Sequence, residues 1–210
     1  DGIRDDLVTG VQTCALPIYR VKNNLQVISS LLDLQANNIR DEQTVSMFRD
    51  SQNRVTSMGL IHERLYQASD LARIEFSEYI AELTQNLLQS YSTNAHNISL
   101  STTADPISLD VDTSIPCGLI INELVSNSLK YAFPDGREGR IHVELRKCEA
   151  NELLLVVRDN GIGLPEGFDA RKTQSLGLKL VHTLVRQLRG KLEISGSNGA
   201  EFSIRFTTHS

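Results

Sequence analysis

The sequence predicts an α+β chain in which a two-helix hairpin precedes a sandwich of helices on a mixed sheet. Two observations predict this class. Apolar residues recur every three or four positions over the first third of the chain, as on one face of a helix. Beyond residue 70, short apolar runs bounded by turn residues alternate with helical patterns, which is typical of layered strands and helices. We therefore expect one domain at residues 19–69 and a second at residues 70–210.

The hairpin is predicted by two apolar stripes separated by a polar turn. Val21, Leu25, Ile28 and Leu32 lie on one helical face, and Asn37-Asn38 ends the first helix. Acidic residues at 41–42 favour the beginning of a second helix, which the pattern extends to about residue 68. A lone hairpin buries only half of each helix, so we expect two copies to form a dimeric four-helix bundle. The alternative is a hairpin that packs on its own downstream domain.

Residues 1–18 form a separate segment that fits neither domain. They show no helical or alternating period and no signal-peptide pattern. The stretch resembles translated sequencing-adaptor read-through, so we interpret it as a non-native leader. An ordinary loose leader is the alternative.

The second domain is predicted as a mixed sheet with helices on one side. Ser77 and Ser114 are the expected first residues of two helices, and Pro116 fits a first helical turn. Turns at 149–151 and 197–199 indicate two hairpins. The expected strands are 73–76, 98–102, 107–111, 141–146, 153–157, 192–195 and 202–206, and the expected helices are 77–91, 114–133 and 176–188.

Composition excludes several classes of function. The 210 residues are 40% hydrophobic, and 21 Lys and Arg stand against 26 Asp and Glu, for a net charge of −5. Without a basic excess we expect no nucleic-acid partner. Apolar runs fall short of the roughly 20 residues of a membrane span, so we expect a cytoplasmic segment with membrane attachment only through missing upstream domains, if at all. The 3 Cys and 5 His are too scattered for a structural metal site.

Three polar clusters follow one another along the second domain. In the first, Asn122, Glu123, Asn127 and Lys130 share neighbouring turns of one helix. Amide and carboxylate oxygens are ligands for a hard divalent cation, and a Lys beyond them can contact phosphate. The alternative is an ordinary solvated polar face.

The second and third clusters are rich in glycine. Asp159-Asn160-Gly161-Ile162-Gly163 follows a strand, where a carboxylate can accept an exocyclic amine and the glycines admit a flat ligand. Residues 175–178 (S-L-G-L) open a helix, where backbone N–H groups attract phosphate. A plain helix cap is the alternative for this third cluster. The phosphate cradles of P-loop and Rossmann proteins are absent from the sequence.

In their order, these motifs resemble the GHKL ATPase superfamily of gyrases, ninety-kilodalton chaperones and histidine kinases. The series is N-E-x-x-x-N-x-x-K-Y, D-N-G-I-G, S-L-G-L and a closing N-G-A-E-F-S-I-R-F. The resemblance covers about residues 76–206 and implies the α/β sandwich of the Bergerat type. The hairpin strings R-V-K-N-N-L-Q-V-I-S-S-L-L and I-H-E-R-L-Y resemble the second subgroup of histidine kinase dimerisation and phosphoacceptor domains. The absence of Trp excludes the cousin group named for its His, Trp and Glu.

One position departs from the subgroup pattern. The phosphoacceptor His is expected immediately before R-V-K-N-N, but Tyr19 occupies that position and cannot form a phosphohistidine. Loss at the junction with the leader explains this more simply than evolved loss. His62 is the alternative nucleophile, but we do not expect it to replace the acceptor, because it belongs to the I-H-E-R-L-Y string at the far end of the hairpin.

The resemblance implies a set of roles for the site residues. Asp159 would accept from the adenine amine of ATP, with Gly161 and Gly163 shaping the base pocket. Asn127 would bind Mg²⁺ with Asn122 supporting it, and Glu123 would be the acid/base partner of the accepting imidazole. The remaining expected nucleotide contacts are Lys130, Tyr131, Arg171, Lys172, Thr173, Ser175, Leu176 and Gly177.

The resemblance also implies the activity and the partners. We expect ATP-dependent autophosphorylation on His and phosphotransfer to an Asp of a response regulator, by a homodimer formed through residues 19–69. Because Tyr19 replaces the acceptor, we expect this chain to be impaired in autophosphorylation. An ATP-binding pseudokinase or dimer scaffold is one alternative, and an anti-sigma-type serine kinase is another. The hairpin argues against the serine kinase, and the retained nucleotide motifs argue against the pseudokinase.

Overall fold

The computed structural model describes residues 5–67, 73–91, 97–149, 151–165, 168, 175–196 and 198–208, with the side chains of 5–19 and 66–67 left out. The chain divides into two compact units, Asp1–Ile74 and Glu75–Ser210. Each unit is described by itself below.

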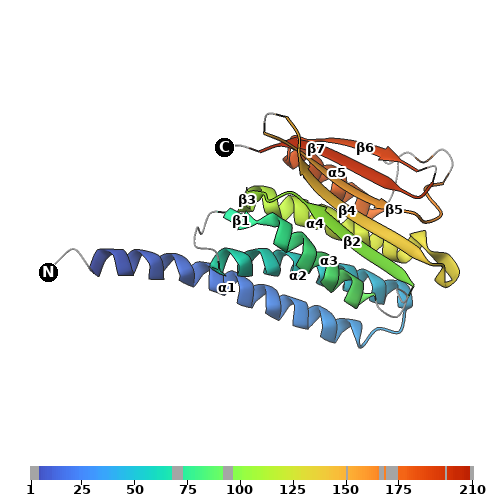
Figure 1. Ribbon diagram of the computed structural model, residues 1–210. Helices are drawn as coiled ribbons and strands as arrows, with labels where there is room; N and C mark the ends of the chain where they lie inside the picture. The colour runs from blue at the N-terminus through green and yellow to red at the C-terminus, as the bar shows by residue number, and fades with distance from the viewer. Residues whose placement is uncertain are drawn as a thin grey trace. The chain divides into compact units, whose positions relative to one another are not determined.

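The first unit is an antiparallel pair of helices, α1 (Asp5–Ala36) and α2 (Glu42–Gln67) (Figure 1). The turn forms where the sequence predicts it, since Asn38 Nδ2 donates to the carbonyl of Leu34 and Asp41 Oδ2 accepts from the backbone N–H of Thr44 at 2.7 Å. The hydroxyl of Thr44 also donates to Asp41 Oδ2, and the hydroxyl and backbone N–H of Thr44 together cap α2 and lower the pKa of Asp41. Lys22 and Glu63 join the two helices through an ion pair of 2.6 Å.

The start of α1 differs from the sequence prediction. The helix begins at Asp5, upstream of the expected start at Tyr19. The prediction was wrong because periodicity detects an apolar stripe, and a helix can be continuous without one. Among the described helices, none combines the length and apolar character needed to cross a membrane.

The hairpin leaves large apolar side chains uncovered. Val27, Leu31 and Leu34 on α1 are 54–59% exposed, and Met47 on α2 is 58% exposed. Ile28, on the same side of α1, is 44% exposed. We call Val27, Ile28, Leu31 and Leu34 the α1 apolar surface.

The second unit contains a five-stranded sheet of order β2-β4-β5-β7-β6. β2 (Ile98–Ala104) pairs parallel with β4 (Gly139–Lys147), and the remaining pairs are antiparallel. The other strands of the sheet are β5 (Glu152–Asp159), β6 (Lys191–Ser195) and β7 (Glu201–Thr207). Two short strands, β1 (Arg73–Glu75) and β3 (Ser108–Asp110), lie outside it.

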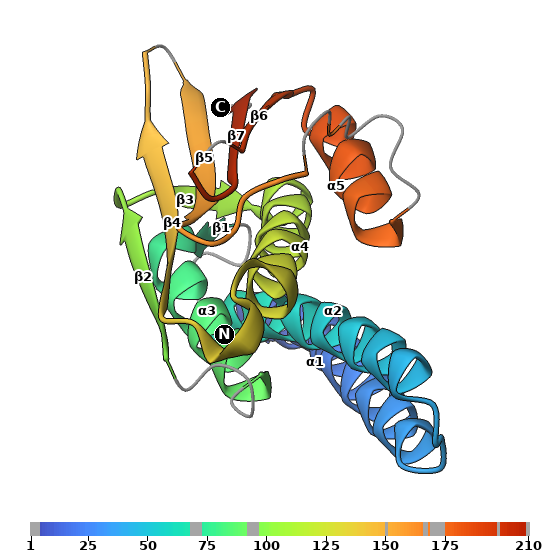
Figure 2. The ribbon, with the colours of Figure 1, turned by 90° about the vertical axis from the view of Figure 1, so that its right-hand side faces the viewer.

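Three helices lie on the same side of this sheet, namely α3 (Phe76–Ser90), α4 (Val111–Asn127) and α5 (Leu176–Gln187) (Figure 2). Inward-facing Ile141, Val143 and Leu145 of β4 are almost fully buried, and they alternate with more exposed polar residues. This alternation is typical of a sheet with one covered face. The α+β class predicted from the sequence is confirmed.

The helix α4 is buried on nearly all sides, with every residue from Pro116 to Ser126 under 9% exposed. Its run of apolar residues explains this, since a helix that is apolar all round belongs in a core. Beyond Asn127 the chain continues as a π-helix, Ser128–Ala132.

Two predicted helix caps are wrong. α3 begins at Phe76 after Glu75, so Ser77 lies inside the helix. α4 begins at Val111, where Asp110 Oδ1 accepts from the backbone N–H of Thr113 at 2.7 Å, so Pro116 lies inside the helix. Ser and Asp are comparable caps, and the position of β3 favours Asp110.

Replacing Asp110 by Ala should lower the free energy of unfolding by about 1 kcal/mol, because α4 loses its cap. Urea denaturation of the full chain followed by circular dichroism would measure this. Ser114→Ala is the matched control, since Ser114 Oγ is buried and has no hydrogen-bond partner in the described part of the chain. A larger loss for Ser114→Ala than for Asp110→Ala would contradict the observed start of α4.

Candidate functional site

The three polar clusters of the sequence lie on three elements of the second unit. The first belongs to the C-terminal half of α4 and the π-helix, the second to the loop after β5, and the third to the first turn of α5. Contacts from α4 and the π-helix reach both the loop after β5 and the first turn of α5.

The carboxylate of Asp159 is held by three hydrogen bonds. Its Oδ1 accepts from the backbone N–H of Gly161 at 2.9 Å and from that of Ala200 at 3.2 Å. Its Oδ2 accepts from Ser128 Oγ at 2.7 Å. Asp159 is 9% exposed, so these donors offset the cost of burying the carboxylate. Its position at the end of β5 agrees with the sequence prediction.

The loop after Asp159 approaches the π-helix too closely for a side chain. A Cβ on Gly161 would lie 2.3 Å from the carbonyl oxygen of Ala132, and that same oxygen accepts from the backbone N–H of Ile162 at 2.9 Å. Gly163 has a φ of +77°, a conformation that favours glycine. Both glycines are therefore required by the path of the backbone.

The first turn of α5 lies against α4 at the predicted residues. A Cβ on Gly177 would lie 2.6 Å from Glu123 Oε2 and 3.9 Å from Asn127 Nδ2. Ser175 Oγ accepts from the backbone N–H of Leu178 at 3.3 Å and so caps α5. The acidic and amide side chains of α4 thus lie beside a helix N-terminus, whose first amide groups have no partner within the helix.

The polar residues of this face differ in exposure. Asn122 is 1% and Glu123 5% exposed, whereas Asn127 is half-buried. Tyr131 on the π-helix is 67% exposed. Lys130 lies with Nζ 5.7 Å from the ring centroid of Tyr91, a cation–π distance.

Some predicted site residues lie outside this arrangement. Arg171, Lys172 and Thr173, which are expected nucleotide contacts, fall outside the described residues. Tyr19 lies within α1, and its side chain falls outside the described part. His62 lies in α2, where burial lowers its pKa.

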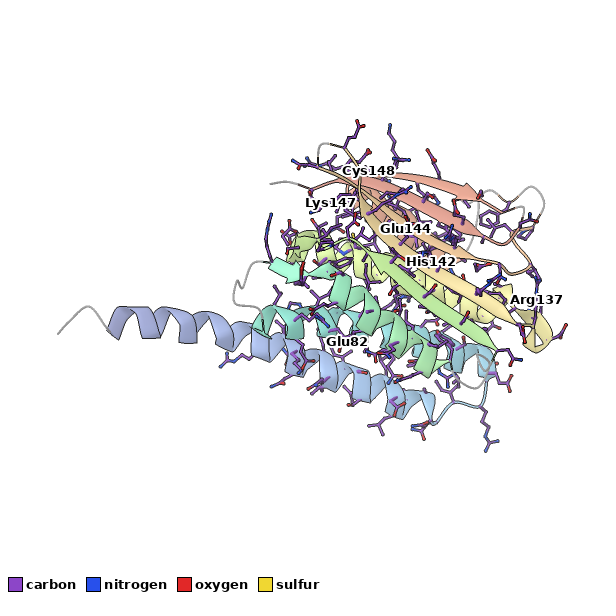
Figure 3. All side chains as sticks on the ribbon, in the orientation of Figure 1. Glu82, Arg137, His142, Glu144, Lys147 and Cys148 are labelled. Carbon is purple, nitrogen blue, oxygen red and sulfur yellow. The ribbon has the colours of Figure 1, made fainter. Side chains whose placement is uncertain are left out.

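The structure adds residues that the sequence reasoning missed. Ser128 follows Asn127 directly, yet only its contact with Asp159 reveals its place in the site. Asn160 ties the loop to β4, because its Oδ1 accepts from the backbone N–H of Arg140 at 2.7 Å and its N–H donates to the carbonyl of Arg140. Arg137, which lies two residues before β4 (Figure 3), donates to the carbonyl of Asn160 at 3.3 Å. In the sequence, the dipeptide Asn160-Gly161 was the one signal for these contacts of Asn160 with Arg140 and Arg137.

Both parts of the chain match protein families. A family described as "Histidine kinase" matches residues 19–91, and one described as "Histidine kinase-, DNA gyrase B-, and HSP90-like ATPase" matches residues 112–210. The first match covers the hairpin and α3, and the second covers the elements that carry the three polar clusters.

Two curated relatives match most of the chain. The chain is 34% identical over 182 residues to the sensor histidine kinase PdtaS of Mycobacterium tuberculosis, with 86% of this chain and 35% of that relative covered. It is 27% identical to the blue-light-activated histidine kinase 2 of Erythrobacter litoralis, with 89% of this chain and 54% of that relative covered. The chain therefore spans about a third to a half of the length of these relatives.

A solved structure supports the fold. The histidine kinase domain of a blue-light-activated kinase from Erythrobacter litoralis superposes with a TM-score of 0.72 at 23% identity, covering 97% of this chain and 94% of that one. With both of its parts matched in this way, the chain belongs to the histidine kinase family and joins a hairpin of the second dimerisation and phosphoacceptor type to a GHKL ATPase fold.

Proposed function

We propose that the chain is the catalytic core of a two-component sensor histidine kinase, which transfers the γ-phosphoryl group of ATP to a His and then to an Asp of a response regulator. The observation that supports this most is the meeting of Glu123 and Asn127 with Gly177 at the first turn of α5. A hard cation needs oxygen ligands, and a phosphate chain needs donors such as the backbone amides at a helix N-terminus. The side chains of α4 and the first turn of α5 offer both.

The donor set of the site fits ATP with Mg²⁺. The Asp159 carboxylate suits the exocyclic amine of adenine, and Gly161 and Gly163 would shape the base pocket through the path that they allow the loop to take. Asn127 would bind Mg²⁺, with Asn122 supporting it. Lys130 and Tyr131, together with residues 175–177 at the N-terminus of α5, would contact the ribose and phosphates. Arg171, Lys172 and Thr173 would add further contacts to the nucleotide. When bound, the cation offsets the charge of the phosphates.

Glu123 is the proposed acid/base residue. Its carboxylate is 5% exposed and lies beside the phosphate end of the site, next to Gly177. There it would accept the proton of the attacking imidazole as the phosphoryl group is transferred, which requires hydrogen-bond reach in the reactive complex.

The hairpin is the proposed dimer interface. The α1 apolar surface places four large side chains, each at least 44% exposed, on one side of a helix. A second copy would remove this area from water, at a gain of roughly 25 cal/mol per Å² of apolar surface. The resulting four-helix bundle would carry the phosphoacceptor position and present it to a response regulator.

Two other functions are less well supported. A serine kinase of the anti-sigma type lacks the hairpin, and residues 19–91 match a histidine kinase family. A pseudokinase or dimer scaffold is favoured by Tyr19 at the acceptor position. It is opposed by the retention of Asp159, Glu123 and Asn127, the residues for which the family resemblance implies nucleotide-binding and acid/base roles.

The purified chain should bind Mg-ATP in isothermal titration. Asp159→Ala should weaken binding at least about tenfold, because it removes a charged hydrogen-bond acceptor. Glu144→Gln is the control, since Glu144 lies on the outer face of β4 and pairs with Arg146 at 3.5 Å (Figure 3). Absence of wild-type binding at millimolar ATP would refute the proposed function.

The chain should not autophosphorylate, whereas Tyr19→His with a native leader should acquire acid-labile label from γ-labelled ATP. The gain should disappear in the double variant Tyr19→His with Glu123→Gln, because the imidazole then lacks its proton acceptor. Acid-labile label on the unmodified chain would show that another residue accepts the phosphoryl group.

Leu31→Glu should convert a dimer into a monomer, because it places a charge within the α1 apolar surface. Light scattering coupled to size-exclusion chromatography would measure the mass. Gln26→Glu adds the same charge at an exposed position on another side of α1 and should leave the dimer intact. A monomeric wild-type chain at micromolar concentration would exclude this interface.

A further inference from the structure

Two hydrogen bonds lock the π-helix Ser128–Ala132 to the glycine loop. Ser128 Oγ donates to Asp159 Oδ2 at 2.7 Å, at the first residue of the π-helix. At its last residue, the carbonyl of Ala132 accepts from the N–H of Ile162 at 2.9 Å. The two ends of one π-helical turn therefore both bond to the glycine loop. π-Helical turns are frequent at functional sites.

The hydrogen bonds of Asp159 leave little freedom to its carboxylate. An ionised carboxylate has about four acceptor positions. Gly161 and Ala200 occupy two of them at Oδ1, and Ser128 occupies one at Oδ2. The position that remains is on the oxygen that Ser128 holds. The orientation of Oδ2 toward a further donor is thus set by a hydroxyl on a different element of the fold.

We propose that Ser128 is a positioning residue for base recognition, which acts through Asp159 to make the site selective for a purine with an exocyclic amine at C6. This inference rests on the proposed nucleotide-binding function and deepens it. Ser128 itself need not touch the base.

The chemistry of the pair explains the selectivity. Because the hydroxyl proton of Ser128 is directed at the carboxylate, both Ser128 Oγ and Asp159 Oδ2 offer only lone pairs to any further partner. An amine at C6 of the purine can donate to such a pair, whereas a carbonyl at C6 meets lone pairs and is repelled. A site built to bond an N–H group discriminates strongly against an analogue that lacks it.

Removal of the hydroxyl should relax this discrimination. In Ser128→Ala, Oδ2 loses its fixed donor, and water becomes its replacement. A water molecule can turn to donate or to accept, so it can bridge the carboxylate to either an amine or a carbonyl. The affinity for ATP should therefore fall, and the preference for ATP over inosine triphosphate should fall with it.

The test compares the affinities of Mg-ATP and Mg-inosine triphosphate for the full chain by isothermal titration. Ser128→Ala should weaken ATP binding about tenfold, as expected for loss of a hydrogen bond to a charged group, and should bring the ratio of the two affinities close to one. Ser128→Thr keeps the hydroxyl and should restore the ratio. Ser126→Ala is the matched control, because Ser126 lies two residues earlier, is 5% exposed, and its Oγ has no hydrogen-bond partner among the described residues.

The outcomes separate this inference from the proposed function. If the wild-type chain binds neither nucleotide, the proposed function fails. If it binds ATP selectively and Ser128→Ala keeps the wild-type ratio, even with a lower melting temperature, Ser128 is merely structural and the inference is overturned. Should Ser128→Ala not fold, Ser128→Cys preserves the size with only a weak donor and decides the question by the same ratio.

Discussion

The carboxylate of Asp159 is the point on which the site of the second unit depends. It ends β5, bonds its own loop through Gly161, bonds the chain before β7 through Ala200, and bonds the π-helix through Ser128. A buried charge must be satisfied by donors, and here the donors come from separate segments. The requirement of one side chain therefore fixes the loop, the sheet and the helix relative to one another. The glycines follow from the same constraint, because backbone segments held this closely leave no space for a Cβ.

A second constraint is the burial of polar groups in α4. Asn122 and Glu123 interrupt an otherwise apolar helix and are 1% and 5% exposed. Such residues lower stability relative to a fully apolar core, and proteins keep them where chemistry requires them. Glu123 lies beside the first turn of α5, where the positive end of the helix dipole favours a nearby carboxylate.

Much of the fold follows from local sequence patterns, and its exceptions have physical reasons. Periodicity gives the hairpin and the strands of the sheet, because burial of one face imposes it. Helix starts were less predictable: Ser114 and Asp110 are similar caps, and only the tertiary position of β3 decides between them. The site clusters could be predicted from their order along the chain. The Ser128–Asp159 bond could not, because it joins residues 31 positions apart and depends on a π-helix that no residue pattern announces. The same holds for Lys130 over Tyr91.

The parallel pairing of β2 with β4 has a consequence for how the fold is held together. Parallel strands cannot be joined by a tight turn, so the chain must cross over between them. In this protein the crossover contains β3, α4 and the π-helix. The pairing of Ile98 with Gly139 therefore joins the two ends of the crossover, which carries the α4 residues that face α5. A ligand that holds α4 in its folded position lowers the entropic cost of closing this crossover. It therefore also stabilises the pairing of the edge strand β2 with β4, although it does not contact β2.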